Sequence, residues 1–403
     1  MTNSQDTSYI LFDGPSRDHL LPLTYTRPVA EIRIGILTIR EKWEKILNSH
    51  CSFLTQGYLK EKYHCHNGKE NILINGSVTP SQKLAEEVGR LRQGSRLIKE
   101  NLLIACNIAD RDAETISFEE IDKYPSVESG AEITQLAHVW DIFSKNGEEL
   151  KKDFDILTKG RKSMPLSNTN KVIHPENVFL EEGAVAECAV INATEGPVYL
   201  GKDAEIMEGS LVRGALALCE HASLKMGAKI YGPTTIGPHS KVGGEVNNAV
   251  IFGYSNKAHD GFLGNSVIGE WCNIGADTNT SNLKNNYAGV KLWNYQKEGF
   301  TDTGLQFCGL IMGDHSKCGI NTMFNTGTVI GVSANIFGDG FPRNFIPSFS
   351  WGGASGFILY NFSKAMEVAE IVMKRRKVSL TATDKKILEE IFSQSARFRA
   401  KNK

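Results

Sequence analysis

Residues 200–246 read LGKDAEIMEGSLVRGALALCEHASLKMGAKIYGPTTIGPHSKVGGEV, and they carry a repeat with a period of six. Every sixth position is aliphatic: Leu200, Ile206, Val212, Leu218, Leu224, Ile230, Ile236 and Val242. The residue four positions after each of these is small in six of the eight cases: Ala204, Ser210, Leu216, Ala222, Ala228, Thr234, Ser240 and Val246. A fixed period of this kind is typical of a coil built from stacked repeats.

The period of six predicts a parallel β-helix with three short strands in each triangular turn. One aliphatic residue of each strand points inward, and the stacked turns share one continuous core. Small residues suit the tight corners between strands. The period returns at Ile268 and Ile274 and again from Met312 to Ile336, so we predict the coil over about Val172 to Ile336. Accidental spacing in a β-sandwich is a poor alternative, since eight consecutive positions agree.

Two stretches interrupt the repeat, residues 246–264 and residues 278–300, and both are rich in Asn, Lys, His and Tyr. Loops on a rigid coil tolerate sequence change and often carry function. We therefore expect a site in these stretches, although they also fit simple decorations of the coil's edge.

The bulk composition excludes several function classes. The chain has 403 residues, of which 41% are hydrophobic and 23% charged, so we expect more than one domain. A formal net charge of −1 gives no electrostatic argument for binding nucleic acid or an anionic membrane surface. No apolar run has the length of a membrane span, and the first residues lack the features of a secretory signal. Eight scattered cysteines predict buried thiols of a cytoplasmic protein, and His64-Cys65-His66 indicates a polar loop rather than a zinc site.

The N-terminal residues alternate between strand and helix patterns. Strands are expected at residues 8–12, 71–76 and 102–108, and helices at 29–47 and 82–91. This alternation predicts an α/β domain with a parallel sheet. Ligands of such sheets bind beyond the carboxyl ends of the strands, where the turns at Gly14 and Gly76 lie.

The predicted domains are residues 1–165 (α/β), 166–350 (coil) and 351–403 (a helical tail). In the tail we expect one helix from Gly356 and a last helix after a cap at Thr381. The basic run at residues 374–377 could bind CoA phosphates, but it is more typical of a solvated helix end, where cations suit the helix dipole. We expect the tail helices to pack on a neighbouring subunit.

Residues 13–28, DGPSRDHLLPLTYTRP, are similar to the signature loop of sugar nucleotidyltransferases. In that family the backbone N–H groups of the loop hold nucleotide phosphates, and an arginine offsets charge on the leaving pyrophosphate. The resemblance implies an α/β nucleotidyltransferase-like domain that takes a nucleoside triphosphate and a sugar 1-phosphate, or a nucleotide sugar. Its implied nucleotide-binding residues are Gly14, Arg17, Arg27, Asn75 and Gly76.

This stretch departs from the family at two positions. Val29 stands where the family has a lysine, and Ser77 stands where it has the aspartate that holds Mg²⁺. A serine hydroxyl is a poor replacement for a carboxylate ligand of Mg²⁺. Asp13, Asp110 and Asp112 remain alternative carboxylates for the ion. The whole chain resembles a subgroup of sugar nucleotidyltransferases described as glucose-1-phosphate thymidylyltransferases.

Residues 255–264, SNKAHDGFLG, and 273–276, NIGA, are similar to the acetyltransferase half of the bifunctional family of N-acetylglucosamine-1-phosphate uridyltransferase/glucosamine-1-phosphate acetyltransferase. In that family an α/β domain precedes a left-handed β-helix, and His259 matches its catalytic histidine. A histidine with a pKa near ambient pH suits the deprotonation of an amino sugar that attacks a thioester. A corner histidine without a role is the alternative.

The resemblance also implies acyl-CoA, in particular acetyl-CoA, as the donor and a sugar phosphate as the acceptor. The residues implied to bind them are Lys225, Lys257, Asn273, Ala276, Asn282, Asn286, Tyr287 and Arg343. Asn282 and the Asn286-Tyr287 pair are alternatives for one family motif. Asn256 and Asn247 stand where the family has lysines, and Phe262 stands where it has tyrosine. The other histidines of the coil, including His221, His239 and His315, are expected to be solvated.

Three functional hypotheses follow. The first is an enzyme of sugar-nucleotide metabolism with a nucleotidyltransferase-like domain fused to an acyltransferase coil, assembled as a homotrimer by resemblance. The second is a non-catalytic nucleotide-sugar-binding or scaffold protein, because two family positions are changed at Val29 and Ser77. The third is a nucleotidyltransferase whose coil only promotes oligomerisation.

Overall fold

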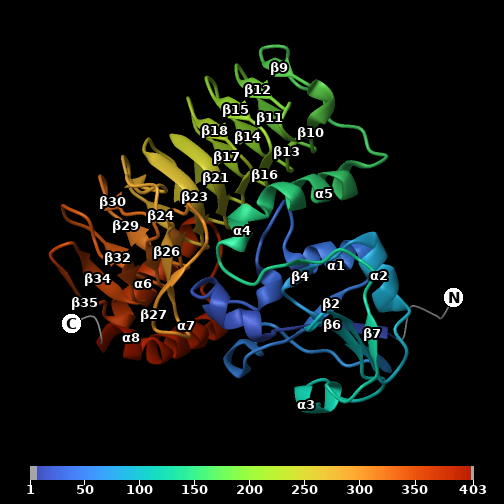
Figure 1. Cartoon of the computed structure of the whole chain (residues 1–403). Helices are drawn as coiled ribbons and strands as arrows, with labels where there is room; N and C mark the ends of the chain where they lie inside the picture. Colours follow the sequence, from blue (N-terminus) through green and yellow to red (C-terminus); the bar gives the residue numbers. More distant parts are fainter. Residues whose placement is uncertain (1–6, 401–403) are drawn as a thin grey trace. The chain divides into compact units, whose positions relative to one another are not determined.

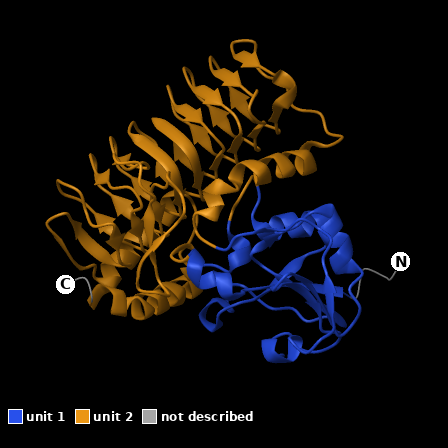
Figure 2. Cartoon of the chain, in the orientation of Figure 1, with its two compact units in different colours: residues 1–20, 26–32, 37–137 blue, residues 21–25, 33–36, 138–403 orange. Residues whose placement is uncertain are grey.

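The computed structural model describes residues 7–400, and it divides into two compact units (Figure 2). Unit 1 comprises residues 1–20, 26–32 and 37–137, and unit 2 comprises residues 21–25, 33–36 and 138–403. Residues 1–6, the start of the stretch considered for a secretory signal, lie outside the described residues, as do residues 401–403. The predicted domain boundaries after residues 165 and 350 stay predictions.

Unit 1 is built on a six-stranded mixed sheet in the order β2-β1-β3-β6-β5-β7. The strands are β1 (Thr7–Phe12), β2 (Cys51–Leu54), β3 (Glu70–Asn75), β5 (Ser95–Lys99), β6 (Leu102–Asn107) and β7 (Ser126–Glu128). β1 pairs parallel with β2 and β3, whereas β6 runs antiparallel to β3 and β5. The α/β class is confirmed, but the wholly parallel sheet was wrong. β5 and β6 form a tight hairpin, and the hydrophobic pattern of a strand does not reveal its direction.

The predicted helix over residues 29–47 is only half correct. Residues Val29–Glu31 form a single 3₁₀ turn (η3), and the helix α1 begins at Ile39 and ends at Leu47. Thr38 caps α1 in a capping box with Glu41. The chain before it cannot be helical because Gly35 has a φ of +73°.

The other elements of unit 1 surround the sheet. They are the 3₁₀ turns η1 (Pro15–Leu20) and η4 (Gly57–Leu59), the helices α2 (Gln82–Gly89) and α3 (Phe118–Ile121), and the strand pair β4 (Val78–Thr79) and β8 (Thr134–Gln135). The expected strands at 8–12, 71–76 and 102–108 and the helix at 82–91 are confirmed within one or two residues. The strand β2 was not predicted.

Unit 2 contains the predicted parallel β-helix, whose strands stack from β9 to β34 (Figure 1). In the regular turns a residue pairs with the residue 18 positions later, as Leu200 pairs with Leu218 and Leu218 with Ile236. This spacing is three repeats of six. All eight aliphatic repeat positions are at most 3% exposed, and all eight positions four residues later are at most 1% exposed. Both rows therefore form the core, and the predicted fold class is confirmed.

The strands of the coil form two long sheets. The first contains β9 (Lys171–Ile173), β10 (Val178–Leu180), β12 (Val190–Asn192), β13 (Val198–Leu200), β15 (Leu211–Arg213), β16 (Leu216–Leu218), β18 (Lys229–Tyr231), β19 (Thr234–Ile236), β21 (Glu245–Ile251), β23 (Phe262–Ile268), β28 (Ile311–Met312), β31 (Val329–Ile330) and β33 (Phe345–Ile346). The second contains β11 (Val185–Ala186), β14 (Glu205–Ile206), β17 (Ser223–Leu224), β20 (Lys241–Val242), β22 (Asn256–Lys257), β24 (Asn273–Ile274), β29 (Lys317–Cys318), β32 (Asn335–Ile336), β34 (Ser350–Gly353) and β35 (Gly356–Leu359).

The second interruption of the repeat leaves the coil as an insertion. It begins after β25 (Asn279–Thr280), which pairs with β30 (Met323–Phe324), and it contains the hairpin of β26 (Lys291–Asn294) and β27 (Gly299–Asp302). On either side of it the ladder continues in register, with Ile268 paired to Met312.

One row of corner residues has left-handed backbone torsions although none of them is glycine. These residues are Asp203, His221, His239, Tyr254, Trp271, His315, Ser333 and Phe349, with φ between +52° and +60°. Positive φ is uncommon for such residues, so the stacked turns of the coil hold this geometry. Six of these eight corners, all except Asp203 and Ser333, therefore carry large ring side chains where the sequence pattern predicted small residues.

The tail differs from the prediction at its start. Residues Gly356–Leu359 form β35, which pairs antiparallel with β34, and the helix α6 spans Phe362–Arg375. α7 (Ala382–Gln394) is capped by Thr381 as expected, and α8 (Ala396–Ala400) follows. The remaining helices of unit 2 are η2 (Leu23–Tyr25), α4 (Asp141–Ser144), α5 (Asn146–Thr158) and η5 (Pro175–Asn177). Among the helices within residues 7–400, none is both long and apolar enough to cross a membrane.

Candidate active site

A cavity of about 790 Å³ lies between one face of the coil and α6. Its coil side includes four residues from consecutive strands: Lys241, Asn256, Asn273 and Lys317. These residues are paired in register across β20, β22, β24 and β29. Paired parallel strands lie about 4.8 Å apart, so the four side chains form one row along the cavity.

The helix α6 closes the opposite side of this cavity. Asn361 caps the helix by accepting a hydrogen bond from the N–H of Lys364 at 3.2 Å. Ala365, Met366, Ala369 and Met373 are buried on one face of α6, which fixes its orientation on unit 2. Its C-terminal turn then brings Arg375 and Arg376 to the cavity.

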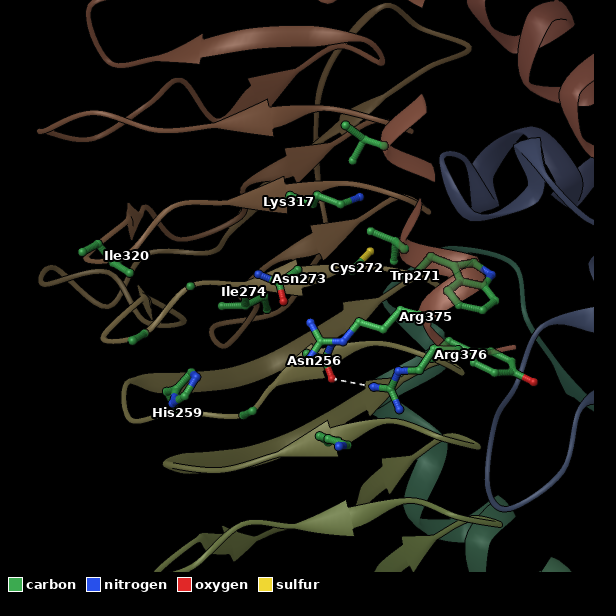
Figure 3. A pocket seen from close by; sticks show the side chains of 17 residues that line it. Asn256, His259, Trp271, Cys272, Asn273, Ile274, Lys317, Ile320, Arg375 and Arg376 are labelled. Carbon is green, nitrogen blue, oxygen red and sulfur yellow. Dashed lines mark hydrogen bonds between the residues drawn. The ribbon is translucent and has the colours of Figure 1, made fainter. Parts of the chain in front are cut away.

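Arg376 joins the helix to the coil. Its Nη2 atom donates a hydrogen bond of 3.0 Å to Oδ1 of Asn256 (Figure 3). The basic run at 374–377 was interpreted as a solvated helix end. For Arg376 that interpretation was wrong, because this side chain is partly buried and bonded to Asn256, whereas Arg375 lines the cavity and is exposed.

Positive charge accumulates at this end of the cavity. Burial lowers the pKa of Lys241, and so do the charges of Arg376, Lys225 and Arg375. Burial and the charge of Arg375 also lower the pKa of Arg376. Within residues 7–400, no carboxylate forms an ion pair with Lys241, Arg375 or Arg376. The cations repel one another, and for Lys241 the charge of Glu205 offsets part of this repulsion.

His259 lies in the corner that follows β22 and lines the same cavity (Figure 3). Its ring is exposed and forms no hydrogen bond with any residue of the described part of the chain. Gly261 allows this corner, because it has a φ of +109° and a Cβ there would lie 2.2 Å from the carbonyl oxygen of Thr278. Because the imidazole of His259 is exposed and has no hydrogen-bond partner among the described residues, it can contact a ligand in the cavity.

Lys257 holds the backbone of the His259 corner from the interior of the coil. It pairs with Val242 in a core row of the coil, and it is 2% exposed. Its Nζ atom donates hydrogen bonds to the carbonyl oxygens of His259 at 2.5 Å and Asp260 at 3.1 Å. Burial lowers the pKa of Lys257 to about 8, although Asp260 acts in the opposite direction. This lysine lies beneath the corner and does not line the cavity.

Of the other residues implied to bind acyl-CoA or the sugar phosphate, some lie in or near the cavity and the rest lie outside it. Asn273 and Ala276 line the cavity with His259, and Lys225 lies close enough to influence the charge of Lys241. The remaining residues belong elsewhere on unit 2: Asn282, Asn286, Tyr287 and Arg343. Asn282 bonds to Asn265, and Asn286 and Tyr287 lie exposed in the insertion. Arg343 lines two other cavities, of about 460 and 400 Å³.

Five corner rings stack along the coil beside the cavity. The centroid distances between successive rings are 4.8, 4.7, 4.1 and 6.3 Å in the order His221, His239, Tyr254, Trp271 and His315. Tyr254 and Trp271 line the cavity. The prediction of solvated histidines was therefore incomplete, because ring faces of His221, His239 and His315 are covered by neighbours.

In unit 1, three of the implied nucleotide-binding residues meet at the carboxyl ends of β1 and β3. A Cβ on Gly14 would lie 3.6 Å from the Asn75 amide, and one on Gly76 would lie 3.1 Å from the carbonyl oxygen of Phe12. The amide of Asn75 donates to the carbonyl of Leu103 and accepts two hydrogen bonds from Ser77. The side chain of Asn75 is therefore already engaged within the sheet.

The two arginines of this stretch are buried. Arg17 is 6% exposed, donates to the hydroxyl of Tyr58 at 3.0 Å and lies 3.5 Å from the carboxylate of Asp13. Arg27 is 5% exposed and lies in the loop before η3. Neither guanidinium is presented openly to a nucleotide phosphate in this structure.

The proposed carboxylates for Mg²⁺ do not gather at one place. The carboxylate of Asp13 accepts hydrogen bonds from the Val29 N–H and the Thr55 hydroxyl, and burial raises its pKa despite Arg17. Asp110 and Asp112 follow β6, which is antiparallel to β3, so they lie at the opposite edge of the sheet from Gly76. Within residues 7–400 no group of three or more His, Cys, Asp or Glu residues fits a metal ion. Asp13, Asp110 and Asp112 therefore do not form a site that fits Mg²⁺. Binding of Mg²⁺ by unit 1 is implied only by the family resemblance.

Comparison with known proteins supports the resemblance on both halves of the chain. Residues 9–162 match the family model described as sugar nucleotidyl transferase. The predicted resemblance of the N-terminal residues is thereby confirmed. The matched range covers the sheet of unit 1 and extends into α4 and α5.

Two of the curated relatives are described as bifunctional. The bifunctional protein GlmU of Methanococcus maripaludis (strain C5) is 30% identical over 217 residues, which are 54% of this chain and 46% of the relative. The bifunctional sugar-1-phosphate nucleotidylyltransferase/acetyltransferase of Sulfurisphaera tokodaii is 32% identical over 145 residues, 36% of each chain. The matches thus span about half of the relatives' length or less.

Among solved structures, the Arabidopsis UDP-N-acetylglucosamine acyltransferase matches 53% of this chain and 80% of its own, with 16% identity and a TM-score of 0.20. This TM-score is low, so the strand pairing described above, and not this match, establishes the coil.

Several cavity residues were not among the predicted site residues. Lys241, Asn256 and Lys317 each stand directly before an inward-facing residue of the repeat, as Asn273 does. This shared position was the available signal, because residues at the same phase of neighbouring turns lie side by side. No comparable signal placed Arg375 and Arg376, since their position depends on how α6 packs.

Proposed function

We propose that the coil carries an acyltransferase that moves an acyl group from acyl-CoA to the amine of an amino-sugar phosphate. The observation that carries this proposal is the position of His259, whose ring faces the cavity together with Asn273 and Ala276 and has no partner within the described chain. A general base needs such access to the proton that it removes. Acetyl-CoA is the proposed donor.

In the proposed reaction the imidazole carries one proton from the amine to the leaving thiolate. The amine nitrogen attacks the thioester carbonyl while a ring nitrogen of His259 accepts the proton that the amine loses. The C–N bond forms, the C–S bond breaks, and the thiolate of CoA leaves with the proton that His259 returns. The buried Lys257 holds the backbone of this corner, so its role is to position the histidine.

A homotrimer is part of the same proposal. Asn282, Asn286, Tyr287 and Arg343 are implied by the resemblance but do not line the cavity of their own chain. In a trimer with sites between adjacent coils, they would serve a neighbour's cavity. Light scattering should then give a mass three times 44.4 kDa. A cytoplasmic location is proposed from the eight free cysteines.

The test of acyl transfer uses the full chain with acetyl-CoA and glucosamine 1-phosphate, and mass spectrometry of the sugar product. We expect N-acetylated sugar phosphate from the wild type and at least a hundredfold slower formation by His259→Ala, in line with loss of about 10²–10⁴-fold for a missing general base. His64→Ala, an exposed histidine of unit 1, is the control and should retain the rate. Absence of product from the wild type would contradict this proposal.

For unit 1 we propose a nucleotidyltransferase-like domain, with nucleotide-sugar binding without turnover as a second candidate function. The engaged carboxylate of Asp13 and the serine at position 77 favour the second candidate. Titration of UDP- and dTDP-sugars measures binding, and release of pyrophosphate from a nucleoside triphosphate and a sugar 1-phosphate measures turnover. Binding without pyrophosphate release supports the second candidate, whereas release supports nucleotidyl transfer.

A further inference from the structure

The cationic end of the active-site cavity has no assigned role in acyl transfer. It is formed by Lys241 of the coil and by Arg375 and Arg376 at the end of α6, and we call these three residues the cationic cluster. None of the three forms an ion pair with a carboxylate of residues 7–400, although the more distant charge of Glu205 acts on Lys241. Burial lowers the pKa values of Lys241 and Arg376, and the neighbouring cations lower them further. Like charges held together at a cavity cost stability unless an anion binds among them.

We propose that the cationic cluster binds a phosphate group of the substrate. This inference deepens the proposed acyl transfer, since it assigns the place of a phosphate in the same cavity. Each guanidinium carries five N–H donors. Arg376 uses one of them on Asn256, and Arg375 uses none within the described chain. The two arginines therefore retain enough donors for several phosphate oxygens, in the bidentate geometry that arginine favours.

Asn256 holds the cluster in place. Its Oδ1 atom accepts the hydrogen bond of Arg376 at 3.0 Å, and its backbone pairs directly with that of Lys241 (Figure 3). A guanidinium that is held before binding loses less side-chain entropy when the anion arrives. Asn256 is thus a positioning residue for the phosphate site.

The rings beside the cluster do not offer a second mode of recognition. Tyr254 stacks on His239 at 4.7 Å on one face and on Trp271 at 4.1 Å on the other, with interplanar angles of 15° and 11°. Both faces of Tyr254 are therefore occupied, and a planar base of a ligand meets only the edge of this ring. The proposal therefore rests on the charges of the cationic cluster.

The probe for the first experiment is inorganic pyrophosphate, titrated by calorimetry into the wild type and two double variants. In Arg375→Gln/Arg376→Gln both cavity arginines lose their charge, whereas Lys374→Gln/Lys377→Gln removes two charges of the same basic run that do not line the cavity. We expect the arginine variant to bind at least about tenfold more weakly and the lysine variant to change less than about threefold. Equal weakening of both variants, or no weakening of the arginine variant, would overturn the proposal.

A second variant separates a local effect from misfolding. Asn256→Leu keeps both arginines but removes the acceptor that holds Arg376, and we expect weaker pyrophosphate binding at an unchanged circular dichroism spectrum. Unchanged binding by Asn256→Leu would overturn the positioning role of Asn256.

The phosphate can come from the sugar phosphate or from CoA, and the same variants distinguish the two sources. Titrations with glucosamine 1-phosphate and with CoA each compare the wild type with Arg375→Gln/Arg376→Gln. If the arginine variant binds either ligand more weakly, the proposal is supported and that ligand is the source of the phosphate. If it binds both ligands as tightly as the wild type does, the proposal is overturned. If the wild type binds pyrophosphate through the two arginines but transfers no acyl group, the proposed function is contradicted and the phosphate site is still supported.

Discussion

The Nζ atom of Lys257 lies 2.5 Å from the carbonyl oxygen of His259, although Lys257 occupies a position of the coil where Val242 and Ile274 face the core. A lysine in a core row is unusual, because burial disfavours its charged form. Here its ammonium reaches the two carbonyl oxygens of the corner that carries the candidate base. The position of His259 and the stability of the coil are therefore coupled through one side chain.

Replacement of Lys257 by methionine should separate stability from activity. Burial lowers the pKa of Lys257 from 10.5 to about 8, so above pH 8 the folded protein releases a proton that the unfolded chain still holds. Stability then rises with pH, because the unfolded state binds more protons. We expect the free energy of unfolding of the wild type, relative to Lys257→Met, to increase between pH 8 and pH 10.5. Urea unfolding at pH 7, 8.5 and 10 measures this difference.

The same variant should lose acyl transfer at pH 7 even where it is as stable as the wild type, because the corner of His259 loses its support. Lys229→Met, at an exposed position of β18 in the other long sheet of the coil, is the control and should show neither effect. A pH-independent stability difference would contradict the assigned pKa of Lys257.

Gly261→Ala should unfold the His259 corner. A Cβ at this position would meet the carbonyl of Thr278 at 2.2 Å, in addition to the strain of a φ of +109°. Gly338→Ala is a matched control, since Gly338 has a φ of +100° and no neighbour within 4 Å. We expect Gly338→Ala to cost about 1–2 kcal/mol and Gly261→Ala clearly more, measured by urea unfolding. Equal costs would mean that the contact with Thr278 relaxes freely.

Ile230→Ala tests the core of the coil. Ile230 is 1% exposed in a continuous aliphatic row, and removal of a buried isoleucine side chain costs about 2–5 kcal/mol. Leu211→Ala provides the comparison, because Leu211 is 50% exposed in the paired strand β15 and should change stability by less than about 1 kcal/mol in the monomer. A large cost for Leu211→Ala would instead reveal that this side chain is covered by another subunit.

Ser77→Asp tests whether unit 1 lost Mg²⁺ binding by a single substitution. Ser77 is fully buried and donates both its N–H and its hydroxyl to Oδ1 of Asn75. A carboxylate there would face that oxygen without water, so we expect a loss of at least about 3 kcal/mol and no rise of Tm with MgCl₂. Ser77→Ala should cost about 1 kcal/mol. If the Tm of Ser77→Asp rises with MgCl₂, the variant binds Mg²⁺ in its folded state, and the expectation of no binding is wrong.

The coil was predictable because its information is local and repeated. Every turn needs an aliphatic residue at the same inward-facing position. The aliphatic row from Leu200 to Val242 therefore identifies the fold from the sequence alone. The sheet of unit 1 lacks this redundancy. The patterns found β1, β3 and β6, but the reversal of β6 depends on the hairpin from β5, which the hydrophobic pattern does not encode.

The candidate site was predictable only on its coil side. His259, Asn273 and Ala276 follow from short motifs on neighbouring turns, and the cavity contains all three. Arg376 lies 120 residues after Asn256 in sequence, and its contact depends on the buried face of α6. The strand at Gly356–Leu359 also displaced the start of that helix from its predicted position. Long-range packing of this kind leaves no periodic trace in the sequence.

The pairing of residues 18 positions apart has a consequence for how the coil folds. Outside the insertion each new turn closes a short loop, from 15 residues between Thr235 and Val250 to 21 residues between Val190 and Leu211, so the entropy cost of adding a turn is nearly the same along most of the coil. The step from Ile268 to Met312 is different, since it must close 44 residues that contain the insertion. Assembly should therefore slow at this one step, and the turns on either side of it should act as two separately nucleating segments.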